Sequence, residues 1–318
     1  MQTTMERVTE TLMGATAAKT AWPKIALVTP VWNSGKYIEQ TIRSVLAQGY
    51  PNLEYFVVDG GSTDGTLEVI RRYEGQIAEL AHGGWMSEPD RGMYDALNKG
   101  FARTSGEIMG WISATDMLHT GALLAVGGIF RDLPEVEWIT GRPTWFNEDG
   151  MSTRVGELQR WSRWRFLAGA NRYIQQESTF WRRSLWEKAG ARMDATRRNG
   201  ADFELWVRFF RHARLYTADT VIGGFRDHGA SLGLSDLEAC HRAHDEFIEV
   251  ELRSASGREG GSRSGLLRAF RGVSRAMMKI PKVCSVWQRA VMSPLYHVPG
   301  PDWAPVIQYD REKWYVKE

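Results

Sequence analysis

The sequence has few of the features that mark secreted, membrane-spanning or zinc-binding chains. It has two cysteines among 318 residues, Cys240 and Cys284, which are far apart and form no paired pattern. No apolar run reaches the roughly 18 residues needed to cross a bilayer. Residues 1–23 contain Glu6 and Glu10 and lack the unbroken apolar stretch of a secretory signal. We therefore expect a reduced, cytoplasmic protein with a flexible N-terminal segment over residues 1–23.

An excess of charge of one sign is also missing. The 40 basic residues are opposed by 38 acidic ones, so the formal net charge is +2 and gives no reason to expect a nucleic-acid partner. The first predicted turn, residues 29–35, has one glycine, whereas a dinucleotide-binding turn needs three. A phosphate-binding loop ending in Gly-Lys-Ser/Thr is absent too. Dehydrogenases and the common ATPases are therefore excluded, and zinc chemistry lacks its usual ligand pattern.

Short apolar runs that alternate with helical patterns make up most of the chain. Residues 25–28 and 55–58 have the composition of buried parallel strands, and each run is followed by a turn and a helix-like segment. A further strand is predicted at 107–112, and helices at 38–46, after 66, at 94–101, at 122–130 and at 205–210; a short run at 216–225 completes the globular part. This order predicts an α/β fold with a mainly parallel central sheet flanked by helices. Ligands of such sheets bind at the carboxyl ends of the strands.

The stretch from residue 253 to 298 is strongly basic, with nine lysines and arginines against one acid, Glu259. Apolar residues lie between the basic ones. A basic amphipathic helix on an anionic membrane surface explains this pattern, and so does a helix that packs on the domain with a solvated basic face. The nine basic residues are Arg253, Arg258, Arg263, Arg268, Arg271, Arg275, Lys279, Lys282 and Arg289.

Four carboxylate-bearing segments follow predicted strands or open predicted helices. They contain Asp59, Asp90 with Asp95, Asp116, and Asp202. Each aspartate alone has an ordinary explanation, because aspartate caps helices and forms turns in all proteins. Their order along one α/β chain is more specific than any of them singly.

The order and surroundings of these acids resemble those of the family-2 inverting glycosyltransferases of the GT-A fold, from about residue 24 to 231. The segments that carry the resemblance are Thr29-Pro30-Val31-Trp32-Asn33, Val57 to Thr66 (VVDGGSTDGT), Ser87 to Gly100 (SEPDRGMYDALNKG), Trp111 to Asp116 (WISATD), Gln175 to Arg183 (QQESTFWRR) and Asp202 to Trp206 (DFELW). The resemblance implies a Rossmann-like GT-A sheet. It also implies transfer of a sugar from a nucleotide diphosphate donor, with a UDP-sugar favoured, to a glycan or lipid-linked acceptor in surface polysaccharide synthesis.

The resemblance also implies roles for individual residues. Asp202 is the expected general base, which takes the proton of the acceptor hydroxyl. Asp116 is the expected ligand of Mn²⁺ or Mg²⁺, and His228 is a candidate for the metal or a phosphate. Donor contacts are expected from Thr29, Pro30, Asp59, Asp90, Asp95, Lys99, Thr115 and Asp116. Acceptor contacts are expected from Gln176, Glu177 and Trp206.

The chain departs from the family pattern at two positions. Thr115-Asp116 stands where relatives often have two adjacent acids, and Ala201-Asp202 stands where they commonly have Glu-Asp. With one carboxylate fewer at the metal, the donor phosphates and water are expected to complete the coordination. The acid that the family uses as base remains.

The resemblance divides the chain into a GT-A domain over residues 24–234 and a helical basic C-terminal extension over 235–318. Residues 24–118 are the expected nucleotide-binding half and 119–234 the acceptor half, where 141–172 carries three tryptophans among arginines. Two other functions stay open: a nucleotidyltransferase on a related sheet, and a non-catalytic carbohydrate-binding or scaffold relative. The sequence also leaves the oligomeric state open, a homo-oligomer included.

Overall fold

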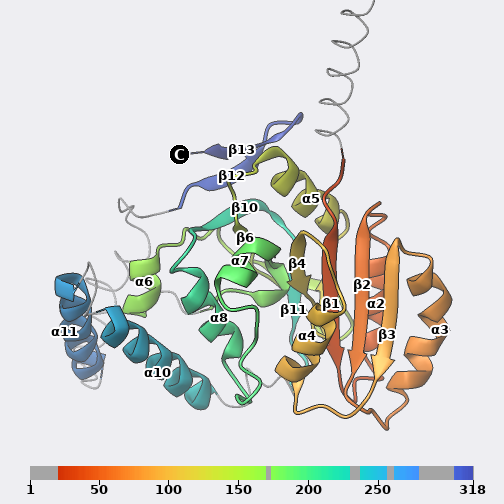
Figure 1. Ribbon diagram of the computed structural model, residues 1–318, viewed down its shortest axis with the longest axis horizontal. Helices are drawn as coiled ribbons and strands as arrows, with labels where there is room; N and C mark the ends of the chain where they lie inside the picture. Colours follow the sequence, from red (N-terminus) through yellow and green to blue (C-terminus); the bar gives the residue numbers. More distant parts are fainter. Residues whose placement is uncertain (1–20, 170–172, 230–236, 256–260, 279–303, 318) are drawn as a thin grey trace, which may run out of the picture.

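The protein is described here from a computed structural model (Figure 1). The described residues are 21–169, 173–229, 237–255, 261–278 and 304–317. Most of the expected flexible N-terminal segment lies outside these ranges. Much of the basic stretch after residue 253 lies outside them as well.

A nine-stranded sheet forms the centre of the molecule, in the order β13-β12-β10-β6-β9-β4-β1-β2-β3. The interior strand β1 (Ile25–Val31) is buried at all seven positions, as an apolar run in a sheet covered on both faces requires. β1 pairs in parallel with β2 (Leu53–Asp59) and β4 (Ile108–Trp111), and β2 pairs in parallel with β3 (His82–Ser87). The predicted α/β class with a mainly parallel sheet is confirmed.

The other half of the sheet is mixed. β9 (Thr179–Arg182) runs antiparallel between β4 and β6 (Trp138–Arg142), and β6 then pairs in parallel with β10 (Leu215–Val221). Because β9 follows directly on the short helix η1 (Gln176–Ser178), this antiparallel insertion carries η1 to the carboxyl end of β4.

The predicted helical C-terminal extension is wrong for the last described residues, which form strands. β12 (Val306–Tyr309) pairs in parallel with β10, and β13 (Trp314–Lys317) pairs antiparallel with β12. Ile307 is fully buried in the main core. The last described residues are therefore part of the central sheet, and only α10 (Leu237–Ala255) and α11 (Gly261–Met278) fit the expected helical extension.

Helices cover both faces of the sheet. Successive side chains of β1 point to opposite faces, so Leu27 belongs to one core cluster and Val28 to the other. The first cluster contains residues of α2 (Ile38–Leu46), α3 (Thr66–Ala78) and α5 (Ala122–Asp132). The second contains residues of α4 (Met93–Ala102), α6 (Arg163–Ala168), α7 (Arg183–Lys188), α8 (Ala201–Phe209) and α10.

α10 and α11 lie at the end of the molecule opposite α3 (Figure 1). α10 packs on α8, and α11 packs on α10 and α6. Of the helices within the described ranges, none combines the length and the apolar character that a bilayer span requires.

A second, four-stranded sheet stands beside the carboxyl ends of the central strands, in the order β5-β11-β7-β8. β5 (Met117–Leu118) pairs antiparallel with β11 (Gly223–Arg226), and β11 pairs in parallel with β7 (Thr144–Phe146), which joins β8 (Ser152–Val155). The pairing of β5 with β11 brings residues near 226 next to the loop that ends at residue 116.

Candidate active site

Asp116 lies in the loop between β4 and β5 and is 3% exposed. Its Oδ1 accepts the backbone N–H of Arg226 at 2.9 Å, and its Oδ2 lies 3.5 Å from Nε2 of Gln176. The Thr41 hydroxyl donates to the Asp116 carbonyl at 2.7 Å and holds the loop from the side of α2. Burial raises the pKa of Asp116 to about 7, although the N–H and the charge of Arg226 oppose this shift.

Arg226 fixes this loop, and the sequence analysis missed it. Its side chain is fully buried. The guanidinium donates to Thr115 O at 2.5 Å, to Gln40 Oε1 at 2.7 Å and to Glu148 O at 2.9 Å. In this segment the sequence points to His228, whereas Arg226 is the residue that holds the acidic loop. Thr115 takes part through its backbone carbonyl.

Gln176 and Glu177 of η1 reach the same place. Gln176 Nε2 donates to Ser113 Oγ at 3.1 Å, on the loop before Asp116. Glu177 is 2% exposed, and its Oε1 and the Oε1 of Gln176 are buried without a hydrogen-bond partner. Burial, followed by the negative charges of Asp116 and then Asp202, raises the pKa of Glu177 well above its ordinary value.

A glycine makes this approach of η1 possible. A Cβ atom at Gly223 of β11 would lie 2.1 Å from the carbonyl oxygen of Glu177. Any larger residue there would push η1 away from the second sheet. Ser178 adds to the contact by donating its hydroxyl to Gly223 O at 2.5 Å.

Asp202 lies in the first turn of α8, which starts after Gly200 in the left-handed region at φ 79°. The Tyr94 hydroxyl of α4 donates to Asp202 Oδ1 at 3.3 Å. Burial raises the pKa of Asp202, while N–H groups of the first helical turn and the Tyr94 hydroxyl lower it. Because the charges of Asp202 and Asp116 both act on Glu177, the fold brings three carboxyl groups from distant segments into one region.

Asp59 closes the turn after β2. It is fully buried, and its Oδ2 accepts the N–H groups of Gly61 and Ser62, each at 3.0 Å, and the Ser87 hydroxyl at 2.6 Å. Asp90 lies against the same turn, because a Cβ atom at Gly60 would be 2.6 Å from its Oδ2. Burial raises the pKa of Asp90. The structure thus joins Asp59 and Asp90, which the sequence separates by thirty-one residues.

Asp95 and Lys99 form surface ion pairs. Asp95 pairs with Arg91 at 2.8 Å, and the Arg91 contact lowers the pKa of Asp95. Lys99 Nζ is 2.8 Å from Glu88 Oε1 and 3.0 Å from Pro89 O. The Lys99 charge therefore holds the segment that follows β3.

The side chain of Thr29 is buried inside the first core cluster. Its hydroxyl is 3.1 Å from the Tyr55 hydroxyl, and Thr29 and Pro30 are both buried strand residues of β1. Burial raises the pKa of Tyr55 far above its ordinary range. A donor that reaches the end of β1 meets the backbone there rather than the Thr29 hydroxyl.

The position of Trp206 does not fit the acceptor contact predicted for it. It is 1% exposed and stacks on Trp111 at 5.7 Å and on Trp138 at 5.5 Å between ring centroids. Trp181 meets it edge-on at 5.8 Å. A ring enclosed by three others has no surface for an acceptor, so Trp206 is a core residue.

His228 follows Arg226 and is half-buried, with its ring 5.0 Å from the ring of Tyr37. Within the described part of the chain, no three histidine, cysteine, aspartate or glutamate side chains come together as a metal-binding group.

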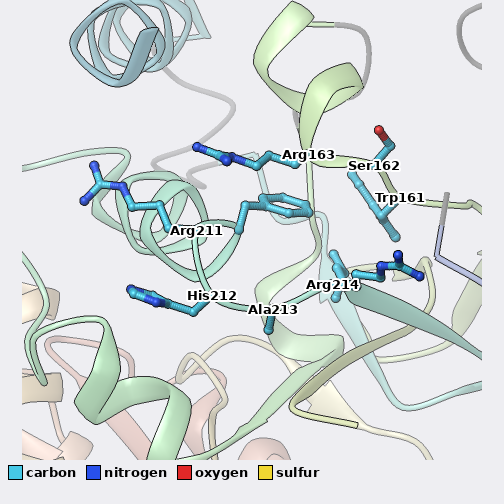
Figure 2. A pocket seen from close by; sticks show the side chains of 9 residues that line it. Trp161, Ser162, Arg163, Arg211, His212, Ala213 and Arg214 are labelled. Atoms are coloured by element: carbon cyan, nitrogen blue, oxygen red, sulfur yellow. The ribbon is translucent and has the colours of Figure 1, made fainter. Parts of the chain in front are cut away.

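A pocket of about 280 Å³ lies at the far end of α8 (Figure 2). Asp202 is in the first turn of α8, and Phe210, just after its last turn, lines the pocket with Arg211 and Arg214. Nine residues of helix at about 1.5 Å each separate the two ends by about 13 Å. None of the predicted site residues lines this pocket. It is therefore separate from the acidic region.

The central sheet, with helices on both faces and acidic residues at the carboxyl ends of its strands, has the GT-A fold. A crystal structure of S. aureus TarS 1–349 in complex with UDP-GlcNAc is similar, with a TM-score of 0.60, 17% identity, and coverage of 85% of this chain and 77% of that one. The mannosyltransferase PcManGT from Pyrobaculum calidifontis, in complex with GDP-Man and Mn²⁺, has a TM-score of 0.53, 19% identity, and coverage of 87% and 86%.

The family model "Glycosyl transferase family 2" matches residues 26–219, and the chain belongs to this family. A curated relative is TuaG of Bacillus subtilis (strain 168), which is named for teichuronic acid biosynthesis. It is 37% identical over 98 residues, which are 30% of this chain and 38% of TuaG. The chain thus spans well under two thirds of the length of this relative.

Proposed function

We propose that this protein is an inverting, metal-dependent glycosyltransferase that moves a sugar from a nucleotide diphosphate donor, a UDP-sugar by preference, to a glycan or lipid-linked acceptor in surface polysaccharide synthesis. The observation that carries the proposal is that Asp116 and Glu177, which are buried, and Asp202, which is half-buried, lie in one region where the charges of both aspartates act on Glu177. Similar proteins agree with it: TuaG belongs to teichuronic acid biosynthesis, and a Staphylococcus epidermidis relative is a poly-β-1,6-N-acetyl-D-glucosamine synthase.

The donor is proposed to bind along the carboxyl ends of β1, β2 and β4. Residues 24–118 form this nucleotide-binding half, and 119–234 supply the acceptor side. Asp59 and Asp90 lie together at the end of β2, where the base or ribose would contact them. Asp95 and Lys99 flank this point on α4. Thr29, Pro30 and Thr115 are proposed to contribute backbone atoms.

The acidic region suits a divalent cation. Two buried oxygen atoms, on Gln176 and Glu177, have no hydrogen-bond partner, and Asp116 has a raised pKa because burial outweighs the opposing charge. When bound, Mn²⁺ or Mg²⁺ would neutralise the negative charge that develops on the leaving diphosphate. Asp116 is the proposed protein ligand, and His228 remains a candidate for the metal or a phosphate.

Asp202 is proposed to act as the general base. The acceptor hydroxyl oxygen forms a bond to the anomeric carbon, the bond from that carbon to the diphosphate oxygen breaks, and the hydroxyl proton passes to Asp202. Attack opposite the leaving group inverts the anomeric centre. The raised pKa of Asp202 favours this role, since a base is most effective when its pKa approaches the working pH.

We also propose that α11 contacts an anionic membrane surface. The protein would then be cytoplasmic and would reach the membrane from its inner face. Leu266 is 69% and Val273 46% exposed, one above the other on this helix, and Arg268 is exposed on another side of it. Arg271 points inward and pairs with Asp245 at 2.5 Å. Exposed apolar and basic groups on one helix fit the apolar layer and the anionic headgroups of a membrane surface. Four of the nine basic residues lie outside the described ranges: Arg258, Lys279, Lys282 and Arg289.

Release of nucleoside diphosphate from a panel of UDP- and GDP-sugars, with and without Mn²⁺, tests the proposed function. We expect at least one donor to be consumed in the presence of the cation and acceptor extract, and Asp202→Asn to abolish most of this turnover. Binding of glycans without consumption of any donor would favour the non-catalytic relative. Formation of a sugar nucleotide from a sugar phosphate and a nucleoside triphosphate would favour the nucleotidyltransferase.

A further inference from the structure

Two buried acceptor atoms on η1 find no donor among the residues that the structure describes. Oε1 of Glu177 and Oε1 of Gln176 have no hydrogen-bond partner, although Glu177 is 2% exposed. Buried polar atoms in folded proteins nearly always have partners, so an oxygen that lacks one indicates a missing ligand or a catalytic role. Here two such oxygens occur on adjacent residues of η1.

Both residues point to Asp116 rather than to another part of the core. Gln176 Nε2 contacts Ser113 Oγ at 3.1 Å and lies 3.5 Å from Asp116 Oδ2. Of the charged groups that act on Glu177, Asp116 has the largest influence. Two carboxyl groups and the amide group of Gln176, with its nitrogen toward Asp116, therefore lie between η1 and the loop after β4.

The positive charge already present does not satisfy this oxygen set. Asp116 receives the backbone N–H of Arg226, while the guanidinium of Arg226 donates to Thr115 O, Gln40 Oε1 and Glu148 O. These guanidinium contacts are with oxygen atoms other than those of the Asp116 carboxylate, although the charge of Arg226 still lowers the pKa of Asp116. Oxygen atoms of carboxylates and amides are the ligands that hard divalent cations prefer.

We propose that Glu177 completes, with Asp116, the cation site of this chain, and that a half-turn of the Gln176 amide, which now directs Nε2 to Asp116, brings its oxygen into the same site. Glu177 then stands in for the second acid that is missing at Thr115, supplied from another segment of the sequence. This inference rests on the proposed metal-dependent function and replaces the acceptor contacts predicted for Gln176 and Glu177. Three protein oxygens leave about three of six positions for donor phosphates and water. Because one of the three is an amide oxygen, the site differs from a cluster of three acids or histidines.

Mn²⁺ binding measured by electron paramagnetic resonance, in the presence of UDP and in a parallel series with GDP, tests the site without any turnover. The variants are Glu177→Gln, which keeps the shape and removes the charge, Asp116→Asn, and the matched control Glu187→Gln on the exposed side of α7. We expect Glu177→Gln and Asp116→Asn to weaken Mn²⁺ binding by at least about tenfold and Glu187→Gln to leave it unchanged.

Thermal unfolding of the same proteins separates loss of the site from loss of the fold. We expect Glu177→Gln to have a Tm at least equal to that of the wild type without metal, because a buried carboxyl without a partner is removed, and to lose the rise in Tm that Mn²⁺ with UDP gives the wild type. Wild-type-like Mn²⁺ binding by Glu177→Gln would overturn the inference and leave the metal-dependent function standing. Absence of Mn²⁺ binding in the wild type would overturn both.

Discussion

Replacing Asp202 by asparagine removes the proposed base with the least possible change in structure. Asparagine has the same shape and keeps an oxygen that accepts the Tyr94 hydroxyl, now 3.3 Å from Oδ1, and the N–H groups of the first turn of α8. Burial disfavours the aspartate charge, so the neutral amide costs the fold little. We therefore expect Tm to be unchanged or slightly higher.

The expected effect on turnover is large. A positioned general base contributes about 10²- to 10⁴-fold to a rate. At about 1.36 kcal/mol for each factor of ten, this corresponds to about 2.7–5.4 kcal/mol of lost transition-state stabilisation. The affinity for the nucleotide should stay the same, because Asp202 belongs to α8 rather than to the strand ends that hold the donor. The loss should thus appear in kcat.

Steady-state transfer assays and calorimetry with the nucleoside diphosphate measure the two quantities separately. Glu187→Gln is the control for loss of a carboxylate charge elsewhere, and its kcat should equal that of the wild type. Transfer by Asp202→Asn at the wild-type rate would refute the assignment of the base. Loss of nucleotide binding together with transfer would show that Asp202 acts on the donor instead.

Three further predictions address the base, the core and the tail. Tyr94→Phe removes a hydrogen bond that lowers the pKa of the base, so the pKa rises and the acidic limb of kcat/KM moves to higher pH; a limb that stays in place contradicts this. Trp206→Ala should lower the free energy of unfolding by about 3–5 kcal/mol, measured by denaturant titration, whereas a loss confined to acceptor KM would return Trp206 to the acceptor site. Leu266→Glu with Val273→Glu should reduce flotation with anionic liposomes, and equal flotation of variant and wild type would dismiss α11 as the contact. These point changes are preferable to truncation after residue 254, which would also remove β12 and β13 from the central sheet.

The local part of the fold could be predicted from the sequence. The apolar runs of β1 and β2 and the helical spacing of α2 depend on neighbouring residues, and their predicted positions agree with the structure. The turn at Asp59 could be predicted for the same reason, because its carboxylate bonds to N–H groups two and three residues later.

The parts that the sequence did not indicate depend on contacts between distant segments. Trp206 follows Asp202 by one helical turn, and only the neighbouring strands show that it is enclosed by aromatic rings. The sequence did not indicate β12, because the strongly basic stretch before it favoured a helical extension. The strand that pairs with it, β10, also lies far back in the chain. The link between Arg226 and the acidic loop spans 110 residues and leaves no local pattern.

Calorimetric titration of the wild-type protein with UDP and with GDP, each with and without Mn²⁺, tests most directly whether these dispersed acids form one donor and cation site. Binding of one nucleotide that appears with Mn²⁺ and disappears on chelation is the predicted result. Nucleotide binding of equal strength with and without the cation, or no binding of either nucleotide, would contradict it.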